Sequence, residues 1–118
     1  MSGTDKYVLM RHRAEWQVLL DDRILEIMSD EDRALDAADL DERLNVDYST
    51  AHIRRRCNKL AEEGLLTRVH PKKAAYVITD EGRAYLNEEY DVANHVYLDE
   101  SSKSLGGVQE GANGEQGI

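Results

Sequence analysis

A helical pattern that ends at a glycine and continues directly into two strand patterns constrains the fold of this chain more than any other feature. The helix is expected over residues 49–63, with the serine at its start as N-cap. Gly64 can end it in the left-handed conformation. Strands are expected over 65–69 and 75–79, joined by a proline-containing turn. The inward face of the helix is predicted from apolar residues at spacings of four and three, which are Ile53, Cys57 and Leu60.

Two further helices are predicted before this segment. Four apolar residues recur at spacings of four, four and three, which predicts a first helix at about 14–29. They are Trp16, Leu20, Ile24 and Ile27. The acidic pair at 21–22 can instead mark a fresh helix start, with a separate short helix within residues 1–20, and both versions bury the tryptophan. A short second helix is expected over 36–44, capped by Asp36.

After the hairpin, the pattern predicts a long last helix from about 80 to 98. A threonine cap and two carboxylates at its positive end favour its start. Its apolar stripe consists of Tyr85, Leu86, Tyr90, Ala93, Val96 and Tyr97. Such a helix has more apolar surface than a monomer of this size can cover. Residues 1–98 are therefore expected to form one domain that pairs with a second copy, and the acidic, glycine-rich residues 99–118 a flexible tail.

The order helix, helix, turn, helix, hairpin, helix is that of a winged helix-turn-helix. The predicted fold class is mainly α with a small β-hairpin, with additional N- and C-terminal dimerisation helices. In this fold the helix at about 49–63 is the recognition helix, and the hairpin at about 66–78 is the wing.

The segment 48–78 is a basic island in an acidic chain. It holds seven of the fifteen Lys and Arg but only two of the twenty-four Asp and Glu, so its net charge is +5 and that of the rest is −14. Such a segment is typical of a surface that contacts phosphates. A helix is about 10 to 12 Å across and the major groove about 12 Å wide, so the outward face of 49–63 fits a DNA duplex. The expected DNA-binding residues are Ser49, Thr50, His52, Arg54, Arg55, Lys59, Arg68, Lys72 and Lys73.

Other interpretations of these basic residues stay open. They can form a solvated helix face, or they can bind an acidic protein, which would make the chain a protein-interaction module of the transcription machinery. Arg56 lies partly toward the core edge by helical phase, and it can brace Glu62 or Glu63 instead of contacting DNA.

The remaining residues predict no catalytic or metal site. Cys57 is expected as a small buried hydrophobe, with a redox switch beneath the recognition helix as the alternative. The histidines lack the spacing of a ligand pair, and no nucleophile with its base is evident, so neither an enzyme, a metal nor a cofactor is expected. A single cysteine, and the lack of a signal-peptide pattern or a membrane-length apolar run, predict a cytoplasmic protein.

Five stretches between about residues 16 and 90 carry a resemblance to a known family. They are Trp16 with Asp21-Asp22-Arg23-Ile24-Leu25-Glu26, then Arg56-Cys57-Asn58-Lys59-Leu60-Ala61, Gly64-Leu65-Leu66, Tyr76-Val77-Ile78-Thr79-Asp80-Glu81-Gly82, and Tyr85-Leu86. Together they resemble the small haloarchaeal winged-helix regulators related to a halophage repressor, and more distantly the MarR and PadR families. The resemblance implies transcription regulation by a homodimer on two half-sites. It also implies a halophilic origin, which agrees with a carboxylate-rich surface.

Two features of the resemblance bear on individual residues. Regulators of this type include oxidative-stress responders, which keeps the redox alternative for Cys57 open. The wing departs from many relatives because its tip is 70–73, His-Pro-Lys-Lys, rather than a glycine-rich turn.

These observations predict a homodimeric transcription regulator on a pseudo-palindromic operator, with repression or activation left open. Two recognition helices about 34 Å apart would enter successive major grooves of double-stranded DNA, each with its wing at the minor groove or backbone. The interface is expected between the N-terminal segment and the last helix. Its predicted residues are Trp16, Leu20, Tyr85, Leu86, Tyr90, Ala93 and Tyr97.

Overall fold

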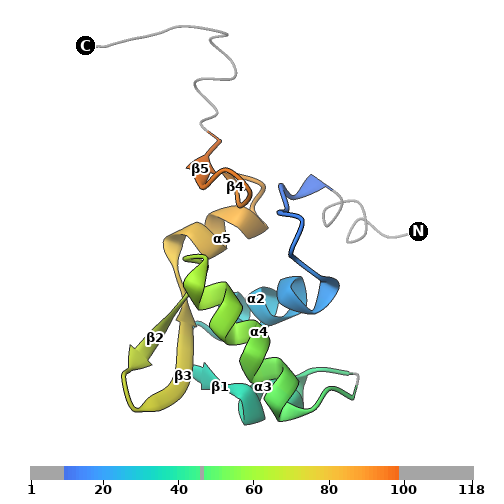
Figure 1. Cartoon of the computed structure of the whole chain (residues 1–118), viewed down its shortest axis with the longest axis vertical. Helices are drawn as coiled ribbons and strands as arrows, with labels where there is room; N and C mark the ends of the chain where they lie inside the picture. The colour runs from blue at the N-terminus through green and yellow to red at the C-terminus, as the bar shows by residue number, and fades with distance from the viewer. Residues whose placement is uncertain (1–9, 46, 99–118) are drawn as a thin grey trace, which may run out of the picture.

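The computed structural model describes residues 10–45 and 47–98 and has a winged helix-turn-helix fold, mainly α with a small β-hairpin, as the sequence predicted (Figure 1). The additional dimerisation helices of the predicted fold class are not confirmed. Helix α4 crosses in front of α2, and the β2–β3 hairpin lies beside α4. The elements are α2 (Leu19–Glu31), β1 (Leu35–Asp36), α3 (Ala37–Arg43), α4 (Thr50–Glu62), β2 (Leu66–His70), β3 (Lys73–Ile78), α5 (Asp80–Leu86), β4 (Tyr90–Asp91) and β5 (Val96–Tyr97).

The second and third helices begin where their capping residues predict. Asp36 accepts a hydrogen bond from the Asp39 backbone N–H at 2.8 Å, and Asp39 accepts one from the Asp36 N–H at 3.0 Å, so α3 begins with a reciprocal capping box. Ser49 Oγ accepts from the His52 N–H at 3.0 Å at the start of α4. Gly64 ends α4 with a φ of 85°, in the left-handed region that favours glycine.

The first helix begins later than the expected residue 14. Helix α2 starts at Leu19, and Asp21 and Asp22 lie in its first turn, where negative charge is favourable. The Asp21 carboxylate accepts from the Val18 N–H at 2.9 Å at the helix start. The later start agrees with the alternative in which the acidic pair marks a fresh start, whereas the separate short helix of that alternative falls largely on residues 1–9, outside the described residues. The preceding residues 11–18 are an arm with a single turn, in which Ala14 O accepts from Gln17 N at 3.2 Å.

The wing, which is the β2–β3 hairpin, forms one sheet with a strand that the sequence pattern did not predict. The antiparallel strand order is β1-β3-β2, and β1 pairs Leu35 with Tyr76. The strands extend closer to the tip than expected, to His70 and from Lys73, and their register shifts between Arg68 and His70. The sheet places Tyr76 in the core, where it is fully buried.

Helix α5 lies unusually close to the end of α4. A Cβ atom on Gly82 would stand 2.4 Å from the Leu65 carbonyl oxygen and 2.6 Å from Ile78 Cγ1. The same carbonyl accepts a hydrogen bond from Thr79 N at 3.1 Å, and the Thr79 side chain caps α5 by accepting from Gly82 N at 3.0 Å. The wing and α5 are therefore tied to the end of α4 at one crowded point.

The prediction of a single helix over 80–98 is wrong. Helix α5 ends at Leu86, and the chain then forms the small antiparallel hairpin β4–β5. Glu88 and His95 have φ values of 67° and 55°, which no continuous helix allows. Tyr90 and Val92, two residues apart, are both buried, so the apolar period here is that of a strand.

The core is a single apolar cluster that α2, α3, α4, the sheet and α5 share. Its largest fully buried side chains include Ile24, Leu25, Met28, Leu40, Ile53, Leu60, Leu65, Tyr76 and Tyr85. No described helix has both the length and the apolar content to cross a membrane. The expected tail at 99–118 lies outside the described residues.

Candidate nucleic-acid interface

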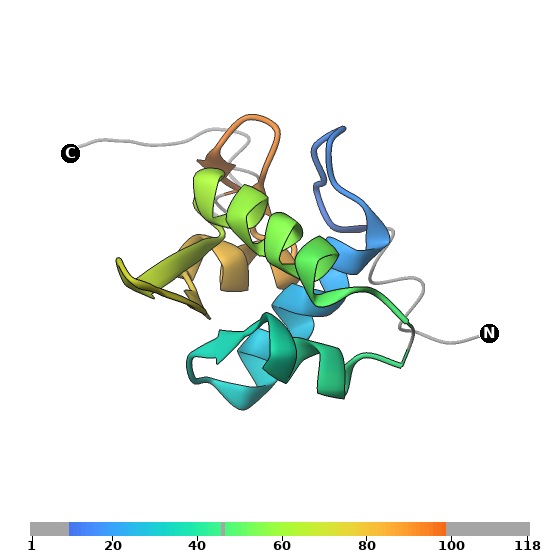
Figure 2. The ribbon, with the colours of Figure 1, turned by 60° about the horizontal axis from the view of Figure 1, so that its bottom comes forward.

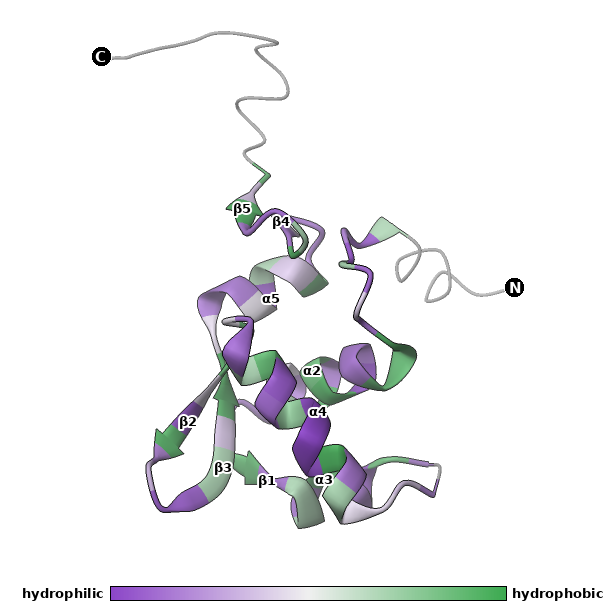
Figure 3. Cartoon of the chain, viewed as in Figure 1, coloured by the Kyte–Doolittle hydropathy of each residue, from purple (hydrophilic) through white to green (hydrophobic). Residues whose placement is uncertain are grey.

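Helix α4 has one buried face and one exposed polar face. Ile53, Cys57 and Leu60 are fully buried, as their spacing predicted. The opposite face is exposed. Figure 2 shows α4 in front of α2, and the α4 ribbon is coloured largely hydrophilic in Figure 3. The residues of the exposed face are Thr50, Ala51, Arg54, Arg55 and Asn58. Two arginines, a hydroxyl and a methyl group therefore face solvent along two turns of helix.

The start of α4 adds an exposed hydroxyl and an aromatic pair. Ser49 is exposed but its oxygen is used as the N-cap. His52 is half-buried, and its ring lies 5.5 Å from that of Tyr48, centroid to centroid. His52 is therefore beside the polar face rather than at its centre.

Arg56 does not brace Glu62 or Glu63, and that interpretation is wrong. Its guanidinium donates to both carboxylate oxygens of Asp21, from Nε at 2.8 Å and from Nη2 at 2.7 Å. It also donates to the Trp16 carbonyl at 3.3 Å. Arg56 therefore faces α2 and the arm, on the side of α4 away from Arg54.

Lys59 lies on this same flank. Its Nζ is 3.2 Å from the Glu63 carboxylate and 5.0 Å from the centre of the Trp16 ring. Within residues 10–45 and 47–98, Lys59 is the predicted DNA-binding residue of α4 whose charge is paired with a carboxylate.

The wing carries exposed cations with different orientations. Lys72 and Lys73 are exposed at the tip. Arg68 folds back along the hairpin, where Nε donates to the Lys73 carbonyl at 3.1 Å and the guanidinium lies 6.0 Å from the centre of the Tyr76 ring. His70 Nδ1 accepts from the Lys72 N–H at 3.1 Å and fixes the turn.

A groove of about 430 Å³ separates the start of α3, the first half of α4 and the wing. It is lined by Asp36, Ala37, Ala38, Thr50, Arg54, Lys73, Ala74 and Ala75. The groove thus brings together Arg54 of the helix and Lys73 of the wing, which are nineteen positions apart in the sequence. The Asp36 carboxylate in the same groove already accepts from the Asp39 N–H.

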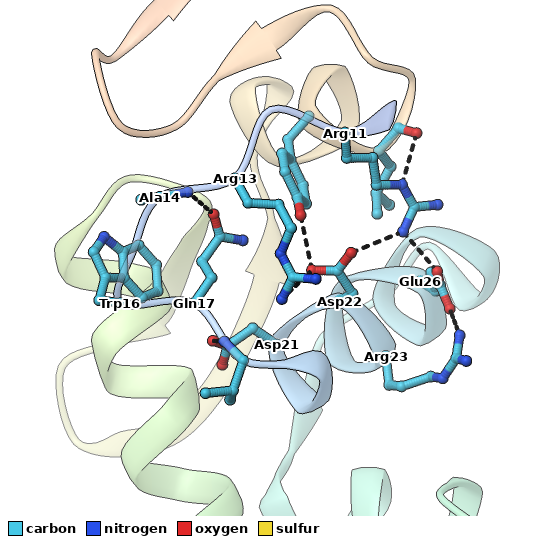
Figure 4. Close-up of polar contacts among 12 residues, drawn as sticks. Arg11, Arg13, Ala14, Trp16, Gln17, Asp21, Asp22, Arg23 and Glu26 are labelled. Carbon is cyan, nitrogen blue, oxygen red and sulfur yellow. Dashed lines mark hydrogen bonds and ion pairs between the residues drawn. The ribbon is translucent and has the colours of Figure 1, made fainter. Parts of the chain in front are cut away.

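Behind α4, two fully buried carboxylates hold the arm and α2 together (Figure 4). Asp22 accepts from Tyr85 Oη at 2.8 Å and from Arg11 Nη1 at 3.1 Å. Arg11 also donates to Glu26 at 2.7 Å and to the Leu86 carbonyl at 3.2 Å. Burial raises the pKa of Tyr85, and the nearby Asp22 charge adds to the shift, so this hydroxyl stays a donor. The cluster belongs to the framework and not to the exposed face.

The predicted dimer-interface residues divide between the core and the surface. Leu20, Tyr85 and Tyr90 are buried within the chain. Trp16 and Leu86 are half-buried. Ala93 is exposed, and Tyr97, 53% exposed, stacks edge-on against Tyr90 with ring centres 5.0 Å apart.

Cys57 lies beneath α4 and is fully buried. Burial raises the pKa of its thiol to about 12, and the Asp21 carboxylate adds to the shift. Such a thiol is a poor nucleophile. Within residues 10–45 and 47–98, His, Cys, Asp and Glu side chains form no cluster of three that could hold a metal ion.

Sequence reasoning missed three residues of this region. Ala51 and Asn58 share the exposed face with Arg54, and Asn58, four positions after Arg54, follows from helical spacing. Asp21, the partner of Arg56, is thirty-five positions away, and nothing in the local pattern relates the two. The Asn58 side chain also accepts a hydrogen bond from Tyr76 Oη, which links α4 to the wing.

Comparisons with known proteins agree with this arrangement. Residues 10–97 match the sequence model of a family described as winged helix-turn-helix phage repressor. Among solved structures, the chain is similar to the PhiH1 repressor-like protein from Haloarcula marismortui, with 39% sequence identity and a TM-score of 0.67. The match covers 74% of this chain and 96% of that one. A search of curated proteins gives no match.

Proposed function

Because the chain belongs to the winged helix-turn-helix phage repressor family, we propose that it represses transcription as a homodimer on a pseudo-palindromic operator. Helix α4 would enter the major groove, and the wing would contact the minor groove or the backbone beside it. The single observation that carries this proposal is the exposed face of α4, on which Thr50, Arg54 and Arg55 lie opposite a fully buried apolar face.

The residues of this face have distinct expected roles. Arginine can donate to guanine O6 and N7 at once, so Arg54 and Arg55 are the candidates for base reading. Ala51, between them and the helix start, can pack against a thymine methyl group. Thr50 is positioned at the first turn of α4, where backbone N–H groups and a hydroxyl favour a phosphate.

The wing would set the register on the duplex. Lys72 and Lys73 are exposed, and lysine contacts of this kind hold phosphates without reading sequence. Arg68 points back along the hairpin, so we assign it to supporting the wing through Lys73 and Tyr76 rather than to the deepest contact. Lys59, paired with Glu63, contributes least.

The homodimer is supported by exposed apolar side chains away from the polar face of α4. Met10, Val96 and Tyr97 are 51%, 47% and 53% exposed. The last two lie on β5, which is at the other end of the molecule from the wing tip in Figure 1. A second copy bound at that end would leave α4 and the wing open to DNA.

The proposal is tested by selecting duplexes from a random pool with the full chain in high KCl, and then measuring affinity for the selected duplex and for an unrelated one. We expect a discrete, saturable complex. Arg54→Ala or Arg55→Ala should cost about 1 to 3 kcal/mol on the selected duplex and relax one base pair of its sequence. Arg33→Ala, an exposed arginine outside α4 and the wing, is the matched control and should change little.

Two results would contradict the proposal. If no duplex is enriched at micromolar protein, the basic face does not read DNA, and the interpretation of the chain as a protein-interaction module becomes the better one. If a duplex is enriched but both arginine variants bind it as the wild type does, the assigned reading residues are wrong.

A further inference from the structure

The three consecutive arginines of α4 divide into two kinds. Arg54 and Arg55 are exposed, whereas the Arg56 side chain is only 21% exposed and turned toward α2. Its Nε and Nη2 groups donate three hydrogen bonds, two to Asp21 and one to the Trp16 carbonyl. A guanidinium has five N–H donors, so most of this one is committed within the chain.

The acceptor makes this commitment costly to break. Asp21 is fully buried, and its carboxylate also accepts from the Val18 N–H at 2.9 Å at the start of α2. If Arg56 turned toward a phosphate, it would leave a buried carboxylate without its cation, which is strongly unfavourable. The pair raises the pKa of Arg56, in agreement with a stable ion pair. Arg56 is therefore not available to DNA while the fold is intact.

The geometry of the pair restricts how α4 can rotate. A planar guanidinium that meets both carboxylate oxygens fixes direction as well as distance, which a lysine ammonium does not. The Trp16 ring lies 6.0 Å from the guanidinium carbon on the same side. Arg54, Arg55 and Arg56 are consecutive residues of one helix. Any rotation of α4 about its axis that displaces Arg56 therefore also displaces the two exposed arginines. Recognition sites tolerate errors of only about 0.5 Å or 10 to 20°.

We propose that Arg56 is a positioning residue, which sets the rotation of the recognition helix through its two-point pair with Asp21 and its contact with Trp16, and so controls sequence discrimination without touching DNA. The inference rests on the proposed function. The arm and the first turn of α2 carry no predicted DNA contact, but under this inference they contribute to DNA sequence specificity.

The test uses the full chain and the selected duplex described above. Arg56→Lys keeps the positive charge but removes the two-point hydrogen bonding. Asp21→Asn removes the negative charge of the acceptor, and Asp21 is not among the predicted DNA-binding residues. Arg83→Lys, at the ion pair with Asp32, is the matched control for the same chemical change elsewhere. For each variant the affinities for the selected and an unrelated duplex are measured at several KCl concentrations, after folding is checked by circular dichroism.

We expect Arg56→Lys and Asp21→Asn to lower the ratio of the two affinities about tenfold, the size of one misplaced base contact, with the salt dependence unchanged. A variant that is merely less stable would lose affinity for both duplexes alike, which would overturn the inference. A direct phosphate contact by Arg56 would appear in Arg56→Met as a salt slope smaller by about one, with the ratio intact, and would also overturn it.

The two proposals fail in different ways. If the wild type enriches no duplex, the proposed function fails and this inference falls with it. If the wild type enriches a duplex and both Arg56→Lys and Asp21→Asn keep its affinity ratio, only the positioning role is refuted.

Discussion

Gly82→Ala reverses the usual effect of this substitution. In an ordinary helix interior, alanine is more favourable than glycine by about 0.8 to 1 kcal/mol, so the change would stabilise the protein. Here the new methyl group would stand 2.4 Å from the Leu65 carbonyl oxygen and 2.6 Å from Ile78 Cγ1. Neither atom is the free end of a flexible side chain, so α5 must move.

The net cost follows from what that movement disturbs. Overpacking of this kind costs about 1 to 3 kcal/mol. Moving α5 away from Leu65 also stretches the 3.1 Å hydrogen bond from Thr79 N to the Leu65 carbonyl, worth about 0.5 to 1.5 kcal/mol. After the gain in helix propensity is subtracted, we expect Gly82→Ala to lower the free energy of unfolding by about 1 to 3 kcal/mol.

Urea unfolding at constant KCl, followed by circular dichroism, measures this change as a lower midpoint with an unaltered slope. Gly64→Ala is the comparison, because a Cβ atom there meets nothing within 4 Å and only the left-handed backbone resists it. A Gly82→Ala variant as stable as the wild type, or more stable, would refute the argument that α5 is held against Leu65 by close contact.

Three further predictions concern single side chains. Lys73→Ala should weaken binding to all duplexes alike and reduce the slope of log affinity against log salt by about one, as measured by titration in KCl. Cys57, with its pKa near 12, should react with a disulfide reagent at pH 8 only as fast as the protein unfolds, and rapid reaction of the folded chain would contradict its burial. The Arg43 hydrogen bond holds the pKa of Glu31 below its ordinary value. The stability from this pair is therefore present above about pH 4.5 and lost as the pH falls, and Arg43→Ala should raise the Glu31 pKa in a carbon NMR titration.

Local signals predicted the centre of the fold correctly. Ser49, Gly64 and the buried spacing within α4 have direct local causes, namely a cap, a left-handed residue and a helical period. The β-hairpin follows from two short apolar runs around a proline. The exposed reading face also follows, because fixing the buried side of a helix fixes the other side.

Some regions were predicted wrongly from local signals. Their structure depends on contacts between residues that are far apart in the sequence. The apolar spacing from Tyr85 to Tyr97 predicted one helix, but the chain turns after β4, where Asp91 accepts from the Asn94 side chain at 2.8 Å, and pairs back as β5. The role of Arg56 depends on a partner on another helix. Gly82 has the local signature of a helix start, whereas the structure shows a second reason for it in the approach of Leu65.

The arm and the two small strands have a consequence for how this domain can be joined to others. Asp91 of β4 is bridged to His12 on one side and to Val96 of β5 on the other. Two neighbouring strand spacings amount to about 10 Å, so the first and last described segments lie within a few residues' reach of each other. A linker of that span could join the two segments and close the domain into a ring. The domain could also be inserted into a surface loop of another protein, because it would hardly separate the two ends of that loop.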